Sequence, residues 1–349
     1  MRLRRLLSGR EENKLLLVAN RLKNSSVAWF AVSTLILFVL VYLADYREIV
    51  SILSSSSGYY VLLSVISGFF TLAMWSVVWY RFFDILRIEV AMGKSLRLLL
   101  SGLFLNAVTP LGRFGGEPFV AYLVSNETEA TYQQALSSVS SADLSNAVPF
   151  ATFGLATVAY VAIFGTLEMP FAGLPALAVL TFLLTAVLIY LAWFNGARTV
   201  VKLVRKFYIF EIEHSRLKPY IESGKERGRE VLDRLETVGK QPKKVSWTLS
   251  VSHLAVLGHI GATYFALLAV GVEPVLHTVV LVVSLSAILT FSPTPGSTGT
   301  MEAGFAVLVL AFYPVSAATA TSVAIIYRVA TYLPGVIFGY LSLLSLKRQ

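Results

Sequence analysis

The chain has 349 residues, of which 56% are hydrophobic and only 14% are charged, and its mean hydropathy is +0.71. This composition excludes a disordered chain and favours a polytopic membrane protein over a set of soluble domains. The absence of cysteine excludes disulfides, thiolate nucleophiles and Cys-bound metals. The formal charge of +9 would suit a nucleic-acid ligand, but the Lys and Arg side chains flank apolar segments, as a membrane topology requires.

The first predicted elements are a basic segment at 1–26 and two membrane spans. Apolar stretches at 27–44 and 58–83 form the spans, and a short polar loop joins them. A cleaved signal peptide is the alternative for the first stretch. It is disfavoured because the stretch is long and no small-residue cleavage site precedes Asp45.

The next apolar segment, 95–125, is interrupted in its middle. The interruption leaves arms of about 15 and 9 residues, which are too short to cross when a span needs about 20. We therefore expect a re-entrant hairpin, followed by a span at 134–165.

The second half of the chain predicts a similar series of elements. A span at 174–194 leads into a polar loop at 195–246, and the next span lies at 247–270. A second interrupted segment at 276–313 predicts another hairpin, and 317–346 forms the last span. In the polar loop, Arg198 to Phe210 is typical of an amphipathic interfacial helix, and we expect the loop to lie at the cytoplasmic membrane surface.

Prolines and glycines cause both interruptions and free backbone groups at membrane depth. In the first hairpin they are Pro110, Gly112, Gly115 and Gly116, and in the second Pro293, Pro295, Gly296 and Gly299. A half-helix that begins after Gly116 or Gly299 would present amide groups and its positive dipole end to a phosphate. The alternative is a plain loop turn at each position.

The basic residues support re-entrant hairpins. If the N-terminus is cytoplasmic and both interrupted segments return to the side they entered, 26 of the 29 Lys and Arg residues lie on the cytoplasmic side. If the first interrupted segment crossed once, the basic loop 195–246 would lie outside. The positive-inside rule disfavours that arrangement.

An internal repeat appears when residue i is compared with residue i+185, and it runs without a gap across the first hairpin and the next span. Pro110 then matches Pro295, and Glu117 matches Glu302. Between 109 and 154, 11 of 46 pairs are identical. In the topology above, each element of the second copy runs opposite to its partner, as in the inverted repeats of secondary transporters.

The predicted fold is therefore an all-α integral membrane protein, built as an inverted repeat of span, span, re-entrant hairpin and span. It has six full spans and two broken hairpins. The organisation is a basic cytoplasmic N-terminus at 1–26, a first repeat at 27–165 and a second repeat at 174–349 that contains the insertion 195–246. Both termini are expected to be cytoplasmic, in the cell membrane.

Ionisable side chains inside apolar segments are candidates for function, because each costs about 2.5–3.5 kcal/mol on insertion scales. Asp143 and Arg328 occupy matching positions in the two repeats, so an ion pair between them would cross the repeat interface. The alternative is that such pairs only lock helices together. The candidate substrate-binding residues are Arg113, Glu117, Glu302, Arg328, Asp143, Asn106 and Asn146.

Enzyme and metal signatures are weak. Gly93-Lys94-Ser95 lacks the upstream glycine of a phosphate-binding loop, and the four histidines lack metal-ligand spacing. His253 and His259 are six residues apart and are interpreted as interior residues with hydrogen-bond partners. We expect no catalytic residues, no metal site and no cofactor.

Three segments resemble the lysylphosphatidylglycerol synthase transmembrane-region family, and the resemblance covers nearly the whole chain. They are Thr109 to Pro118, Pro293 to Glu302 and Tyr327 to Pro334. This family is a flippase-like membrane domain found fused to aminoacyl-phospholipid synthases, to some glycosyltransferases, and alone. The resemblance implies a lipid translocator, with Arg113, Glu117, Glu302 and Arg328 at the family's polar motif positions.

Two departures from the family pattern concern the substrate. The family commonly has an Arg and an Asp three residues apart in the third span of the first repeat, whereas this chain has Asp143 and Asn146. The longest polar stretch is the loop 195–246, so the resemblance does not extend to a synthase domain. A polyprenyl-linked or other anionic lipid is therefore as plausible a substrate as lysyl-phosphatidylglycerol.

The sequence leads to one main functional hypothesis and leaves two alternatives open. The main hypothesis is a translocator that moves a phospholipid or polyprenyl-linked lipid between leaflets by alternating access, with membrane lipids as partners and no nucleic acid. The alternatives are a membrane-embedded enzyme or accessory subunit of lipid biosynthesis, and an ion-coupled transporter of a soluble solute. A homodimer and a separate lipid-modifying enzyme are open as further partners.

Overall fold

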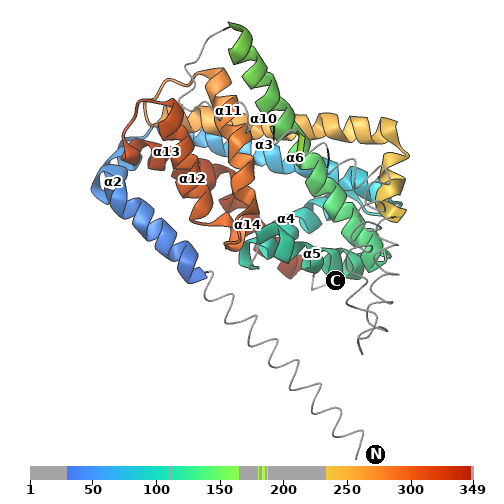
Figure 1. Ribbon diagram of the computed structural model, residues 1–349. Helices are drawn as coiled ribbons and strands as arrows, with labels where there is room; N and C mark the ends of the chain where they lie inside the picture. Colours follow the sequence, from blue (N-terminus) through green and yellow to red (C-terminus); the bar gives the residue numbers. More distant parts are fainter. Residues whose placement is uncertain are drawn as a thin grey trace, which may run out of the picture.

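The computed structural model describes residues 30–109, 112–164 and 233–346, together with Leu180, Leu183, Leu184 and Val187. All regular structure in this part of the chain is helical (Figure 1). Four segments are long and apolar enough to cross a membrane: Gly58–Ile85, Tyr132–Phe164, Pro242–Ala269 and Ala317–Leu346. They coincide with four of the predicted spans, and the protein is an all-helical integral membrane protein.

Three sequence predictions fall wholly or mostly outside the described residues: the N-terminal segment 1–26, the span at 174–194 and the amphipathic helix at 198–210. Of the first predicted span, Phe30–Leu43 is described as a short apolar helix. The polar loop expected after it is instead largely α2 (Tyr46–Ser55). Asp45 caps this helix because its Oδ1 accepts the backbone N–H of Arg47 at 3.0 Å.

The helices α3 (Gly58–Ile85) and α10 (Pro242–Ala269) form an antiparallel pair (Figure 1). The Ser64 hydroxyl donates to the carbonyl of Ala262 at 2.8 Å, and the Thr71 hydroxyl donates to that of Ala255 at 3.0 Å. At Gly258, the lack of a side chain lets the α10 backbone approach α3 closely, because a Cβ there would collide with the Thr71 hydroxyl. Small and hydroxylated residues therefore set the close spacing of the two helices.

The first interrupted segment forms a helical hairpin of α4 (Met92–Val108) and α5 (Gly112–Glu127). Its two open ends lie together, because Lys94 Nζ and Glu127 Oε2 are 3.4 Å apart. The prediction that the second arm begins after Gly116 is wrong, since α5 begins at Gly112. Gly116 lies inside the helix and packs against Asn106 of α4, where a Cβ would collide with the Asn106 amide oxygen.

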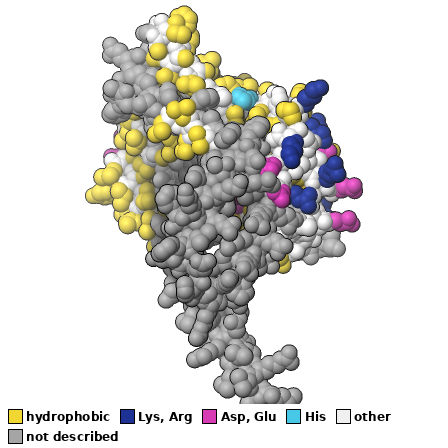
Figure 2. Space-filling model, turned by 45° about the vertical axis from the view of Figure 1, so that its right-hand side comes forward, with side chains coloured by type: hydrophobic (Ala, Val, Ile, Leu, Met, Phe, Trp, Pro, Cys, Tyr) yellow, Lys and Arg dark blue, Asp and Glu magenta, His cyan; other side chains and the backbone are white. Residues whose placement is uncertain are grey.

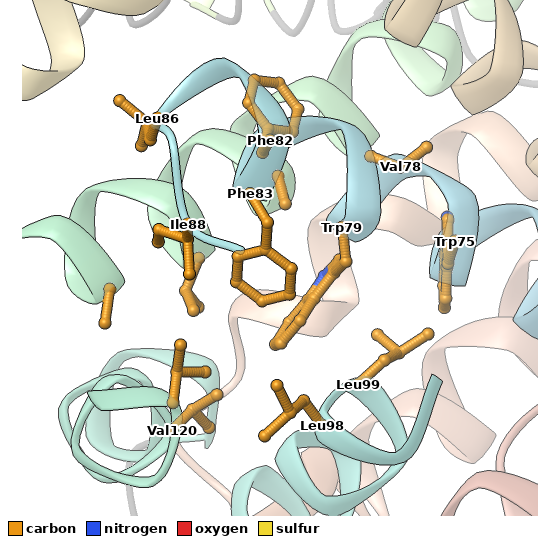
Figure 3. Packing of buried hydrophobic residues seen from close by; sticks show 14 of the residues in the cluster. Trp75, Val78, Trp79, Phe82, Phe83, Leu86, Ile88, Leu98, Leu99 and Val120 are labelled. Carbon is orange, nitrogen blue, oxygen red and sulfur yellow. The ribbon is translucent and has the colours of Figure 1, made fainter. Parts of the chain in front are cut away.

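The C-terminal half of α3 holds this hairpin in place. Figure 3 shows Trp79 and Phe83 of α3 directed toward Leu98 of α4 and Val120 of α5. Phe83, Leu98 and Val120 are fully buried. Close packing of these side chains fixes both arms against the span.

The second interrupted segment comprises α11 (Leu276–Ser286), the 3-10 turns η1 (Ala287–Phe291) and η2 (Pro295–Ser297), and α12 (Thr300–Phe312). Its open ends also lie together, since the N–H of Val275 donates to the Tyr313 hydroxyl at 3.2 Å. The arm α12 begins directly after Gly299, where the sequence predicts a half-helix to start.

The matching spans of the two halves differ in continuity. The helix α6 (Tyr132–Phe164) continues through Pro149, whereas the predicted single helix at 317–346 is divided into α13 (Ala317–Thr331) and α14 (Leu333–Leu346). Pro334 lacks the N–H that would bond the carbonyl of Ala330, which weakens the helix at this point. That carbonyl lies against α3 at Gly68, where a Cβ would collide with it.

Charged side chains gather at one end of the molecule. Figure 2 shows Lys, Arg, Asp and Glu together at the right of the view, while hydrophobic side chains cover other parts of the described surface. Two ion pairs join the ends of four helices: Lys94 with Glu127, and Lys244 Nζ with Asp84 Oδ2 at 2.9 Å. The ends of α3, α4, α5 and α10 that carry them thus share one side of the molecule.

Candidate functional site at the hairpin tips

The N-terminus of α12 is held by its own acidic residue. Glu302 lies in the first turn, and its Oε2 accepts the backbone N–H of Gly299 at 2.7 Å. Gly299 has φ 83°, a left-handed conformation that glycine adopts without strain. A carboxylate at this position also interacts favourably with the positive end of the helix dipole. The sequence thus places a negative charge at the broken end of a helix inside the apolar region.

Arg328 of α13 completes this arrangement. Its Nε donates to Glu302 Oε1 at 2.7 Å, its Nη2 donates to the carbonyl of Gly296 at 3.0 Å, and its guanidinium carbon lies 3.7 Å from the centre of the Tyr332 ring. The side chains of Arg328 and Glu302 are only 13% and 11% exposed. A guanidinium has five N–H donors, and two of them are used in these contacts with described residues. The structure shows no hydrogen bond from the remaining donors to a described residue.

The sequence suggested an ion pair between Asp143 and Arg328, but Arg328 pairs with Glu302 instead. Arg328 makes its ion pair with Glu302, which is 26 residues earlier in the chain. Asp143 lies on α6, in the first half of the chain. Sequence reasoning named Glu302 and Arg328 as candidates but did not pair them, because the fold of the turns η1 and η2 between α11 and α12 could not be predicted.

The tips of the two hairpins touch at this site. Gly296 in η2 has φ 58° and lies so close to Ala107 of α4 that a Cβ would approach the Ala107 Cα to 3.2 Å. The same Cβ would collide with the hydroxyl of Tyr332. We call the group formed by Gly296, Gly299, Glu302, Arg328 and Tyr332 the hairpin-tip site.

Three hydroxyl groups form a triangle next to the hairpin-tip site. The Oγ of Ser292 lies 3.0 Å from Thr294 Oγ1 and 2.9 Å from Thr300 Oγ1, and the two threonine oxygens are 3.3 Å apart. Ser292 and Thr294 are buried. Sequence reasoning missed these residues because serine and threonine between prolines are also typical of an ordinary turn. Their burial, visible only in the structure, distinguishes them.

The first hairpin tip contributes Asn106 and Glu117. The Oδ1 of Asn106 is buried and has no hydrogen-bond partner among the described residues. Glu117 Oε2 accepts a hydrogen bond from the Ser140 hydroxyl of α6 at 3.1 Å. The side chain of Arg113 lies outside the described residues, as do Pro110 and the side chains of Gly112 to Gly115. Asn106 thus lies next to Ala107, the residue of α4 that meets η2, whereas Glu117 is directed to α6.

Asn146 lies away from the tips and links two spans. Its Oδ1 accepts from the hydroxyl of Ser252 on α10 at 3.1 Å, and Ser145 Oγ lies 3.4 Å from the same hydroxyl. All three residues are buried. This contact resembles the helix-locking alternative considered for intramembrane polar residues more than a ligand site.

The family model of the lysylphosphatidylglycerol synthase TM region matches residues 26–339. The chain is 26% identical over 335 residues to a UPF0104 membrane protein of Methanocaldococcus jannaschii, covering 90% of this chain and 93% of that protein. It is 25% identical over 321 residues to a UPF0104 membrane protein of Pyrococcus horikoshii, covering 90% of this chain and 95% of that protein. The match over most of its length shows that this integral membrane protein belongs to the lysylphosphatidylglycerol synthase transmembrane-region family.

Proposed function

We propose that this protein moves a lipid with an anionic, phosphate-bearing head group between the leaflets of the cell membrane. The main support is Arg328, whose guanidinium uses two of its N–H donors in contacts with described residues. It is held in the apolar region where a broken helix meets the opposite hairpin. An intramembrane arginine with N–H donors that are not used within the protein can bind a phosphate through charge-assisted hydrogen bonds. On this proposal the protein is a translocator and not an enzyme.

The lining of the site suits a phosphate. The triangle of Ser292, Thr294 and Thr300 lies at the start of α12, so hydroxyl donors, free backbone amides and the positive helix end converge there. Glu302 balances the charge of Arg328 when the site is empty. If the phosphate takes over Arg328, Glu302 is released to meet a cationic group of a zwitterionic or aminoacylated lipid.

The proposal includes an inverted repeat with six spans and two re-entrant hairpins, the architecture of alternating-access transporters. The described helix bounds support it, because α3, α4, α5 and α6 match α10, α11, α12 and α13 at the spacing of 185 residues. The contacts match as well. A Cβ at Gly154 would approach Ser284 of α11, and one at the matching Gly339 would collide with Leu100 of α4.

The antiparallel pairing of α3 with α10 supports the inversion. These helices occupy equivalent places in the proposed repeat. They contact each other near Thr71 and Ala255, which are 184 residues apart, close to the repeat spacing of 185. Two equivalent helices that run in opposite directions across a membrane are related by a two-fold axis in the membrane plane. Such an axis places the second hairpin on the opposite side from the first.

The test is transbilayer movement of labelled lipids in proteoliposomes, with zwitterionic, anionic, aminoacylated and polyprenyl-phosphate probes. We expect Arg328→Ala and Glu302→Ala to slow movement of one lipid class by about ten- to a hundred-fold, because a hydrogen bond to a charged group contributes about 1.5–3 kcal/mol. Arg328→Lys keeps the charge but loses the fork of donors, and should restore only part of the rate.

The matched control is the exposed ion pair of Lys244 with Asp84, whose N–O distance is 2.9 Å against 2.7 Å for the Arg328 pair. Lys244→Ala should leave the rate unchanged. Full activity in purified Arg328→Ala and Glu302→Ala would remove the site assignment. If the wild-type protein moves none of the probes, the accessory-subunit and soluble-solute alternatives replace the proposal.

A further inference from the structure

His259 lies on α10 (Pro242–Ala269) and is 7% exposed. The rings of Trp75 from α3, Phe150 from α6 and Tyr327 from α13 surround it. Their centroids lie 5.1, 5.7 and 5.9 Å from that of the imidazole. A cation within about 6 Å of an aromatic ring centre is attracted to the ring face. Three such rings form a cage that can accommodate an imidazolium.

The hydrogen bond of His259 depends on its protonation state. Its Nδ1 lies 2.8 Å from the Tyr327 hydroxyl. In a neutral ring protonated at Nε2, Nδ1 accepts the hydroxyl proton of Tyr327. In the imidazolium both nitrogens donate, so the Tyr327 oxygen must accept and its proton must turn to another partner.

Tyr327 connects His259 to both sides of the break in the second hairpin. Ser286, the last residue of α11, lies near the Tyr327 side chain. The Tyr327 ring stacks on Phe305 of α12, with centroids 4.4 Å apart and an interplanar angle of 13°. Arg328, the next residue, holds Glu302 and Gly296. A proton on His259 therefore changes a contact shared by both arms of the hairpin.

We propose that His259 is a proton-binding site and that its protonation couples lipid movement to the proton gradient. The coupling part rests on the proposed function, whereas proton binding does not. Tyr327 of α13 is the titratable group that contacts the imidazole, and Arg328 beside it pairs with Glu302 of α12. The helices around the cage also carry Asp143 on α6, His253 on α10, and Arg81 and Asp84 on α3. The charge of Arg328 is balanced by Glu302, so a proton on His259 is the net change.

Proton binding is measured from the fluorescence of Trp75, because an imidazolium in contact with an indole quenches its emission. The probe is a variant in which the other four tryptophans, Trp29, Trp79, Trp193 and Trp247, are replaced by phenylalanine. We expect emission to fall as the pH is lowered, because protonation brings a positive charge against the indole. His259→Gln in this background should abolish the transition.

His253 provides the matched control on the same helix. Its ring nitrogens lie 2.9 Å from Thr152 Oγ1 and 2.7 Å from the carbonyl of Leu249, and its ring meets Phe153 edge-on. His253→Gln should keep the Trp75 transition. A flat titration in the parent, or a transition that survives His259→Gln, would overturn the proposal. If the tryptophan variant does not fold, the imidazole nitrogen signals of the four histidines are titrated by NMR in the unmodified chain.

Coupling is measured in proteoliposomes with a pH gradient across the bilayer. With one proton per lipid, one pH unit should sustain a lipid distribution of about ten to one between the leaflets, since a pH unit is a ten-fold ratio of proton activity. His259→Gln should still move lipid but reach an even distribution. If the wild type moves lipid but its final distribution does not depend on the gradient, the coupling alone is overturned. If the wild type moves no lipid, the proposed function is overturned, and the fluorescence result on proton binding is unaffected.

Discussion

At the scale of single residues, the hairpin-tip site combines the positive charge of Arg328 with a backbone turn at Gly299 that positions Glu302. Arg328 would be costly alone at membrane depth, and Glu302 and the ring of Tyr332 offset that cost. Glu302 can serve because Gly299 turns the chain so that its N–H points to the same carboxylate. Removing either charge would leave the other buried and uncompensated.

Gly299→Ala should disturb this device. The left-handed φ of 83° strains any residue with a Cβ by about 1–3 kcal/mol, and the new methyl group would lie 2.7 Å from the carbonyl oxygen of Ser33. We expect a lower unfolding temperature and slower lipid movement. The control is Gly93→Ala on α4, where a Cβ meets nothing within 4 Å. Equal stability of the two variants, measured by thermal unfolding in detergent, would contradict this account.

The candidate residues could be selected from the sequence, but their partners could not. Glu302 and Arg328 stand out because charge is rare in apolar segments, and Gly299 because glycine commonly precedes a half-helix start. The Ser292 triangle and the cage around His259 had no such signal. They arise from residues of ordinary type that only the packing of distant segments brings together.

At the scale of elements, interruptions position the site. The spans were predictable because a long apolar run has few alternatives, and α3 begins at the predicted residue. The start of α5 was not, because Gly115 and Gly116 were interpreted as helix breakers. Glycine is tolerated in a helix where another backbone approaches closely, as Asn106 does at Gly116. The division between α13 and α14 was missed because Pro149, at the matching position, leaves α6 continuous.

The pairing of α3 and α10 yields a prediction at this scale. Gly258→Ala should lower the unfolding temperature, because its Cβ would collide with the Thr71 hydroxyl and lie 2.7 Å from the Ser67 carbonyl oxygen. Overpacking of this kind costs about 1–3 kcal/mol. Gly58→Ala at the start of α3, with open space around its Cβ, is the control. No difference between them would mean that the two helices can separate without cost.

At the scale of the whole molecule, the proposed inversion predicts which sides the hairpins enter from. The chain has no cysteine, so single cysteines can be introduced without a background. Cysteines at the exposed Glu89 and Glu129, beside the open end of the first hairpin, should react with an impermeant thiol reagent from the cytoplasmic side. Cysteines at the exposed Glu273 and Pro314, beside the second, should react from the opposite side. Labelling of all four from one side would exclude the inverted arrangement.

The division of the last span into α13 and α14 has a consequence for the resting state. Two identical inverted halves would give inward-open and outward-open forms of equal energy. On the proposed alternating-access arrangement this chain breaks that equality, because α6 is continuous whereas the matching span is divided into α13 and α14, and Arg328 stands at the position that matches Asp143. The two proposed forms would then differ in energy even across a symmetric membrane, and we expect the unloaded protein to rest with one side preferentially open.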